Sequence, residues 1–125
     1  MPTINEVLER TARVRPDAYD DKTKAGWLIE LDGKLYREVI LRHRVTELPD
    51  LPKAFPEDGN KPLLVLPPYD NLYDLYLYAQ VDLYNREITN YNNSAALFDT
   101  AMDEWRRAWH REHQPLGAGY YKNVI

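Results

Sequence analysis

Hydrophobic residues recur at helical spacing over most of the chain, and the longest such stretch begins at residue 69. From Leu72 to Tyr91, apolar and aromatic side chains cover well over half of a helical wheel and leave only a narrow polar strip. We predict a helix over residues 70–91. A helix that is apolar around most of its girth needs neighbours on several sides, and in a chain of 125 residues some neighbours could come from other copies.

Two helices are predicted before this stretch. The first covers residues 3–14, because Thr3 and Glu6 form a capping box and Pro16 ends the pattern. The second covers residues 21–44, with Asp20 or Asp21 as its N-cap. Its two apolar stripes indicate a helix packed between other elements. A glycine inside a helix lowers the stability of the helix by about 1 kcal/mol relative to alanine. At Gly33 we therefore expect either a bend in the helix or a close contact with another element.

A fourth helix is predicted to follow a turn at residues 92–94. Asparagine tolerates the left-handed conformation, and Asn93 or Ser94 can cap the new helix, which Pro115 stops. Its apolar stripe consists of Leu97, Phe98, Ala101, Met102, Trp105, Ala108 and Trp109. We expect the third and fourth helices to form an antiparallel hairpin. One continuous helix through residue 92 is the alternative.

Residues 46–68 contain most of the nine prolines, which exclude a helix and a central strand. Only Leu63–Leu66 has the composition of a strand, which could pair with the segment before it. A connection of about 20 residues with little regular structure is usually functional or disordered. Its apolar residues indicate that it lies on a surface, and we expect Leu51 and Phe55 to make such contacts.

The predicted fold is mainly α, with about four helices, a Pro-rich loop that carries a short β segment, and an extended C-terminal tail. Residues 1–113 form one domain with loop 46–68 inserted, and residues 114–125 form the tail. The composition, 44% hydrophobic and 29% charged, is that of a folded protein. No secretory signal or membrane span is expected. The lack of cysteine excludes disulfides and thiolate sites, and the net charge of −4 argues against general binding to phosphate backbones.

Candidate chemistry is sparse. His110 and His113 lie three residues apart beside Glu112, but a zinc site needs a second pair of ligands. The aspartates of residues 17–21 lack the spacing, glycine and closing glutamate of a calcium loop. Histidines among arginines at a helix end are typical partners of the helix dipole. We therefore expect no catalytic residue, no metal site and no cofactor.

The tyrosines of the third helix could form a stacking platform for single-stranded nucleic acid, but acidic residues lie among them and only Arg86 is basic. Core and protein–protein contact is the favoured interpretation. The predicted subunit interface consists of Tyr69, Tyr73, Tyr76, Tyr78, Tyr84 and Tyr91. A solvated tail has no need of apolar and aromatic residues, so the tail either folds back on its own core or docks on a partner. We favour docking, through Leu116, Tyr120, Tyr121, Val124 and Ile125.

Two stretches carry a resemblance to a known family. They are PDAYDDKTKAGWLIELDGKLYREVI and LPPYDNLYDLYLYAQVDLYNREITNYNNSAALFDTAMDEWRRAWHREHQP, within which Y-D-x-L-Y-x-L-Y and Y-N-N-S-x-A-L-F are the most specific runs. Over roughly residues 16–115, the chain resembles the head–tail connector (adaptor or head-completion) proteins of tailed phages and prophages.

The resemblance implies a helical subunit that forms a ring, expected to be dodecameric, under the portal protein. Such a ring extends the DNA channel, offers a platform for tail or head-completion proteins, and lets double-stranded DNA pass without specific binding. The C-terminal segment, residues 116–125, would insert into the portal. The location implied is the virion neck, assembled in the host cytoplasm, with no membrane. The alternative is a small monomeric or dimeric binding or regulatory module of a prophage, and an enzyme using His110 or His113 is a third hypothesis.

Overall fold

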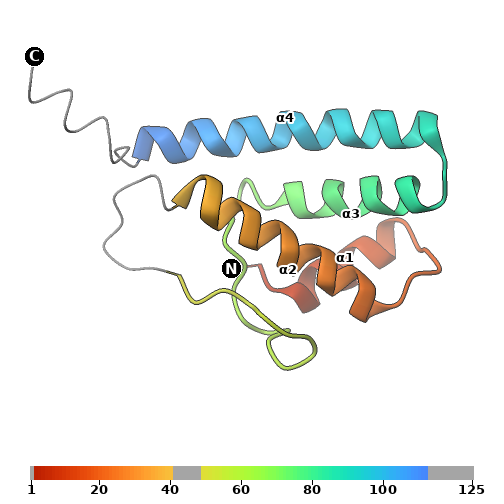
Figure 1. The fold of residues 1–125 in the computed structure, drawn as a ribbon, viewed down its shortest axis with the longest axis horizontal. Helices are drawn as coiled ribbons and strands as arrows, with labels where there is room; N and C mark the ends of the chain where they lie inside the picture. The colour runs from red at the N-terminus through yellow and green to blue at the C-terminus, as the bar shows by residue number, and fades with distance from the viewer. Residues whose placement is uncertain (1, 41–48, 113–125) are drawn as a thin grey trace, which may run out of the picture.

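The computed structural model describes residues 2–40 and 49–112 of the chain. Within these residues the fold has four α-helices and no β-strand: α1 (Ile4–Val14), α2 (Asp21–Glu38), α3 (Asn71–Tyr84) and α4 (Ile88–Glu112). The predicted mainly α class is confirmed. Figure 1 shows α3 and α4 side by side and running in opposite directions, with α1 and α2 on the other side of α3.

The first two helices begin where their caps predict. The Thr3 hydroxyl accepts a hydrogen bond from the Glu6 amide at 3.2 Å. Ile4 is buried in the first turn of α1, and Val7 and Leu8 are buried in the next. Asp20 caps α2 by accepting from the Thr23 amide at 2.8 Å. Local side-chain chemistry therefore sets both starting points.

The α2 helix is shorter than predicted. It ends at Glu38, with Val39 as its C-cap, whereas the sequence pattern predicts helix to residue 44; residues 41–44 lie outside the described part. No atom of the described chain lies within 4 Å of a Cβ placed on Gly33, so the expected close contact there is absent. Gly33 instead lies at an open surface of α2.

The predicted turn at residues 92–94 is wrong. α3 ends at Tyr84, and α4 runs from Ile88 through these residues without a break. The chain reverses over residues 85–87, where Arg86 takes the left-handed conformation (φ 59°) and the Glu87 amide donates to the Asp82 carbonyl at 2.9 Å. Ser94 does not cap a helix, because its hydroxyl donates to the Asp82 carboxylate at 2.8 Å. A contact between helices thus replaces the expected cap.

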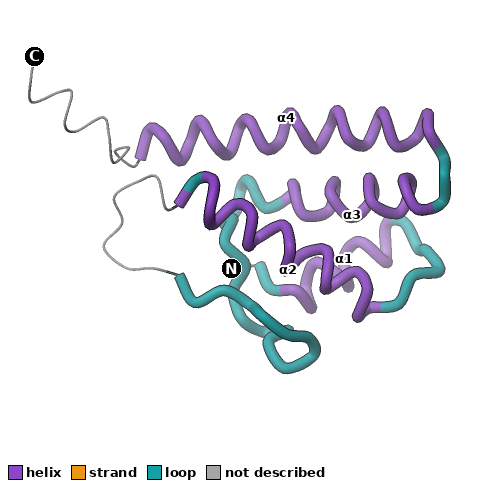
Figure 2. The backbone as a smooth tube through the Cα atoms, viewed as in Figure 1, coloured by secondary structure: helices purple, strands orange, loops and turns teal. Residues whose placement is uncertain are grey.

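The predicted strand at Leu63–Leu66 is not formed in the described residues, and Figure 2 draws this segment as loop. Thr3 and Pro62 form an isolated bridge, and the Leu63 amide donates to the Pro2 carbonyl at 2.8 Å. The next two amides donate to side chains: Leu64 to Asp32 at 2.9 Å and Val65 to the Tyr73 hydroxyl at 2.8 Å. With its donors used in this way, the segment cannot continue a ladder with a second strand.

The hydrophobic core surrounds α3, which contacts α1, α2 and α4 of the same chain. The helix that seems from its sequence to need partner copies therefore finds neighbours on several sides within one subunit. The core includes Ile4, Val7, Leu28, Leu31, Leu35, Leu63, Val65, Leu72, Tyr73, Leu77, Val81, Ala101 and Trp105.

Candidate interaction surface

The polar strip of α3 is covered by α1. Arg10 donates to Asp70 at 2.9 Å and pairs with Asp74 at 2.7 Å, and Arg15 pairs with Asp82. Side chains at four-residue spacing lie along one side of a helix, so these three aspartates form a line that meets the arginines of α1. Burial raises the pKa of Asp74, and the bonds from Arg10 oppose that rise. This side of α3 holds the fold together and offers no free surface.

A buried polar network joins α2, α3 and the loop. Asp32 is fully buried and accepts a hydrogen bond from the Tyr73 hydroxyl at 2.6 Å and from the Leu64 amide at 2.9 Å. Burial raises the pKa of Asp32 to about 6, and the two hydrogen bonds offset part of that rise. The prediction of Tyr73 as an interface residue is wrong, because its whole side chain lies inside the subunit.

Aromatic side chains reach the surface near the α3–α4 turn. Tyr84 stacks on Trp27 with ring centroids 5.4 Å apart and planes 8° apart, while remaining 59% exposed. Tyr19 lies 5.6 Å from Trp27, and its hydroxyl donates to the Asn85 side chain at 2.8 Å. The Tyr84 ring is therefore held in a fixed orientation with one face open to solvent.

Tyr76 and Tyr91 extend this aromatic region along the two helices. Tyr76 packs on Phe98 at 5.1 Å, and its hydroxyl accepts from Gln80 at 3.2 Å. Burial raises the pKa of Tyr76, and the charge of Glu30 and the phenols of Tyr84 and Tyr91 add to the rise. We define the turn surface as Tyr76, Leu83, Tyr84, Ile88 and Tyr91.

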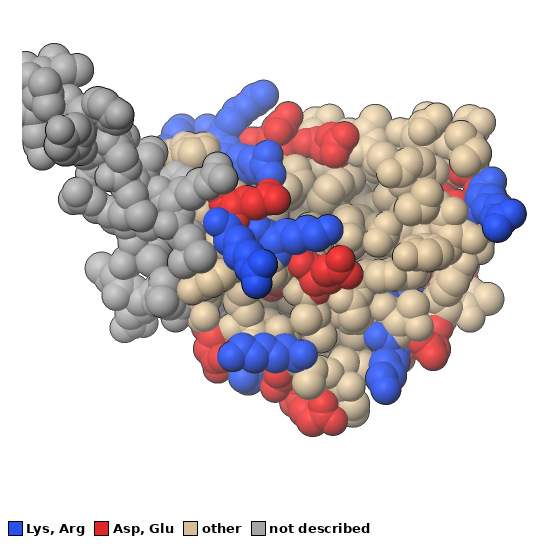
Figure 3. All heavy atoms as spheres, viewed as in Figure 1, with Lys and Arg blue, Asp and Glu red and all other residues tan. Residues whose placement is uncertain are grey.

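The turn surface is mostly apolar, with charged residues at the turn itself. Leu83 is 41% exposed and Ile88 is 61% exposed. The sequence carries no charged residue over positions 75–81 of α3 or over positions 88–98 of α4, and between these stretches the turn itself exposes Arg86 and Glu87. Figure 3 shows mostly uncharged atoms along the α3–α4 pair near the turn, with charged atoms at its tip and a larger group of Lys, Arg, Asp and Glu toward the C-terminal end of α4. Exposed apolar residues with aromatic neighbours and few charges are typical of the centre of a protein–protein interface.

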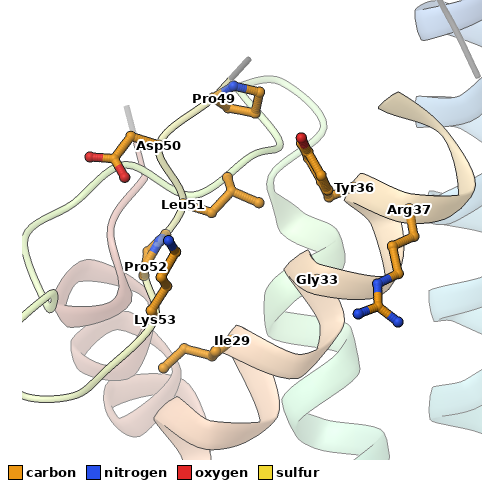
Figure 4. Close-up of a pocket in the computed structure, with 9 residues that line it drawn as sticks. All are labelled: Ile29, Gly33, Tyr36, Arg37, Pro49, Asp50, Leu51, Pro52 and Lys53. Atoms are coloured by element: carbon orange, nitrogen blue, oxygen red, sulfur yellow. The ribbon is translucent and has the colours of Figure 1, made fainter. Parts of the chain in front are cut away.

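A separate pocket opens between α2 and the start of the described loop (Figure 4). It has a volume of about 490 Å³ and is lined by Ile29, Gly33, Tyr36, Arg37, Pro49, Asp50, Leu51, Pro52 and Lys53. The Leu51 side chain points toward α2 in this view. Phe55, the other predicted contact residue of the loop, is half-buried against the core. Both residues thus make contacts within their own chain.

The remaining predicted interface residues are dispersed. Tyr69 is half-buried beside the core, and Tyr78 lies under the Arg15 guanidinium, which is 5.5 Å from its ring centre. Tyr76, Tyr84 and Tyr91 lie together on the turn surface. The five residues predicted to dock the tail, Leu116, Tyr120, Tyr121, Val124 and Ile125, lie outside the described residues.

The acidic residues considered for metal binding have structural partners. Asp17 accepts from the Tyr19 amide at 2.9 Å and pairs with Lys24 at 3.4 Å, while Asp20 caps α2. Over residues 2–40 and 49–112, no three His, Cys, Asp or Glu side chains gather in a metal-binding arrangement. His113 lies outside this part of the chain. No helix of the described residues is long and apolar enough to cross a membrane.

Sequence reasoning missed Asp32 and Asp82, the two fully buried carboxylates. A signal for Asp32 exists, because it lies within the apolar stripe of α2, four residues after Leu28 and three before Leu35. An acidic residue in such a stripe must find hydrogen-bond donors inside the fold. Asp82 gives a weaker signal, because its position in the polar strip of α3 is equally typical of a solvated residue.

No model of a known protein family matches this chain, and comparisons with curated proteins and with solved structures give no significant match.

Proposed function

We propose that this chain is a structural virion protein of a tailed phage, a head–tail connector subunit that forms a ring under the portal. The ring would extend the DNA channel and offer a platform for tail attachment. Two observations support the proposal: the resemblance of residues 16–115 to connector proteins, and the exposed apolar turn surface. The turn surface is the single structural observation that carries it.

The turn surface suits a subunit contact. Tyr84 is anchored on Trp27, so little conformational entropy is lost when a partner covers it. Ile88 projects from the first turn of α4 and is 61% exposed, which leaves apolar area that burial would remove from water. In a closed ring each subunit uses two different surfaces, because the contacts run head to tail. The turn surface would be one of the two.

The other parts of the chain take roles that follow from the same proposal. The antiparallel hairpin of α3 and α4 would present the turn surface, and the Pro-rich loop of residues 46–68 would contact a neighbour. Residues 114–125 would dock on the portal. An overall charge of −4 suits a ring through which DNA slides, since a basic lining would hold the phosphates. The role proposed is non-enzymatic and needs no cofactor.

The test is the mass of the purified protein, alone and mixed with the portal protein, measured by sedimentation velocity. We expect a ring, or a stoichiometric complex with the portal. Ile88→Glu should prevent assembly because it places a charge at the centre of the contact. Leu97→Glu is the matched control: it lies on the same uncharged stretch, is 59% exposed, and stands nine residues away, on the opposite side of α4.

The second candidate is a monomeric or dimeric binding or regulatory module. It is favoured by the burial of Tyr73 within the subunit and by the packing of α3 against three helices of its own chain. A compact monomer that ignores the portal would support this candidate and overturn the connector proposal. Equal effects of the Ile88 and Leu97 substitutions would also contradict the role of the turn surface.

A further inference from the structure

The buried carboxylate of Asp32 connects three separate parts of the fold. It lies on α2, accepts from the hydroxyl of Tyr73 on α3 at 2.6 Å, and accepts from the Leu64 amide of the loop at 2.9 Å. The same Tyr73 hydroxyl accepts from the Val65 amide at 2.8 Å. Two of these three hydrogen bonds end on one fully buried acidic group, and the third ends on the tyrosine that this group orients.

We propose that Asp32 is a proton-linked latch that holds loop residues 63–66 against α2 and α3, so that release of this segment is coupled to ionisation of its carboxyl group. The inference concerns the fold of the subunit itself and does not depend on the proposed function.

The groups that face Asp32 are few. Tyr73 is the titratable group that contacts it from α3, and the loop contributes backbone amides. Within the described residues, no basic side chain contributes to the pKa of Asp32. Burial raises the pKa of Tyr73 well above 10, with Asp32 and Asp70 adding to the rise, so the phenol stays neutral over the range concerned. On its other side the segment is held by backbone contacts with Pro2 and Thr3, which do not titrate.

The direction of the coupling follows from the two states of the segment. In the closed state, burial raises the pKa of Asp32 from its ordinary value of 3.8 to about 6. In an open state water reaches the carboxyl group, and its pKa returns toward the ordinary value. Between these two values opening releases a proton, so a rise in pH favours opening. Protonation of Asp32 stabilises the closed state most below pH 4, and this contribution is lost as the pH rises through 6.

The size of the effect follows from the same two pKa values. One proton released per opening changes the opening equilibrium about tenfold per pH unit, which gives about 100-fold between pH 4 and 6. Above pH 6 the equilibrium should become constant. Opening would uncover Leu63 and Val65, whose side chains are only 2% and 0% exposed in the closed state. An apolar segment would thus become available at neutral pH more often than at acidic pH.

Native-state hydrogen exchange tests the latch. The protection factors of the Leu64 and Val65 amides are measured by NMR from pH 4 to 7.5, after correction for the intrinsic exchange rates. Both should fall about 100-fold, with the change complete near pH 6. The Ala101 amide, in the middle of α4, reports on global unfolding and should be better protected throughout. The proposal is overturned if the two loop amides show constant protection, or if they exchange only with Ala101.

Two variants distinguish the ionisation of Asp32 from other effects of pH on the protection factors. Asp32→Asn removes the titrating group, so the protection of Leu64 and Val65 should no longer depend on pH. Tyr73→Phe keeps the carboxyl group but removes a hydrogen bond that lowers its pKa, so the pH at which the protection stops falling should be higher than in the wild type. The second variant keeps the idea testable if the first does not fold. If protection stopped falling at the same or a lower pH in Tyr73→Phe, the proposal would be contradicted.

Discussion

Replacing Arg15 with methionine should destabilise the fold by about 2–3 kcal/mol, because it leaves a buried carboxylate without its cation. Arg15 follows the last turn of α1 and donates to both oxygens of Asp82, which is fully buried on α3. In the variant only the Ser94 hydroxyl, 2.8 Å away, would still donate to this carboxylate. Methionine retains the apolar stem of arginine, so the loss is mainly electrostatic.

The magnitude follows from the different exposure of the two partners. Removing one member of a fully buried ion pair costs about 3–5 kcal/mol. The Arg15 side chain is 36% exposed, whereas that of Asp82 is inaccessible, so water can enter the space that Arg15 leaves and hydrate part of the carboxylate. That hydration lowers the expected cost to about 2–3 kcal/mol, a value between those of exposed and buried pairs.

Urea unfolding of the variant and the wild type, analysed by linear extrapolation, measures the loss. Arg13→Met is the matched control, because Arg13 also lies on α1 and pairs with Glu9 at 2.7 Å, but both side chains are about 70% exposed. Its cost should be at most about 0.5 kcal/mol. Adding Asp82→Asn to Arg15→Met should recover part of the loss. Equal costs for the two arginine variants would refute the argument from burial.

Four further changes test other parts of the structure, and urea midpoints measure the first three. Tyr76→Ala should cost about 2 kcal/mol, less than a fully buried aromatic residue; a loss near zero would place the ring in solvent. Arg86→Gly should stabilise the protein by about 0.5–1 kcal/mol, since glycine adopts φ 59° without strain; any destabilisation would contradict this. Gly59→Ala should cost about 1–2 kcal/mol, because its Cβ would lie 2.8 Å from the Asn5 side chain; a neutral effect would show that Asn5 moves aside. Deleting residues 116–125 should leave the helical circular dichroism signal unchanged and abolish binding to the portal, and retained binding would remove the tail from the proposed function.

Features set by local chemistry could be predicted from the sequence. Thr3 and Asp20 start their helices as expected, because a side chain that accepts from an amide three residues later needs no distant partner. The apolar stripe of α4 is confirmed in its second half, where Ala101, Trp105 and Ala108 are buried, whereas Leu97 is 59% exposed. These signals reside within a few residues of one another.

Features set by contacts between helices could not be predicted in this way. Residues 92–94 have the composition of a turn, but the pairing of Ser94 with Asp82 and the reversal at Arg86 keep them within α4. The segment at residue 63 has the composition of a strand, but its amides donate to side chains of α2 and α3. In both cases the deciding partner is distant in sequence.

The candidate site could be predicted only in part. The ten tyrosines look alike in the sequence, and the structure places those of the described residues in different environments. Tyr73 lies in the core, Tyr78 lies under an arginine, and Tyr84 stacks at the surface. Which tyrosine reaches solvent depends on where α1 and α2 pack, and this follows from the three-dimensional arrangement of the helices.

The arginine–aspartate pairs between α1 and α3 have a consequence for synthesis on the ribosome. Arg10 and Asp70 are 60 residues apart, and Arg15 and Asp82 are 67 apart. At about 5–20 residues per second, several seconds pass between synthesis of the first helix and of its acidic partner. During that time Ile4, Val7 and Leu8, which are buried in the finished fold, lack the contacts that α3 supplies. The nascent N-terminal helix thus keeps an uncovered apolar side until α3 has been synthesised.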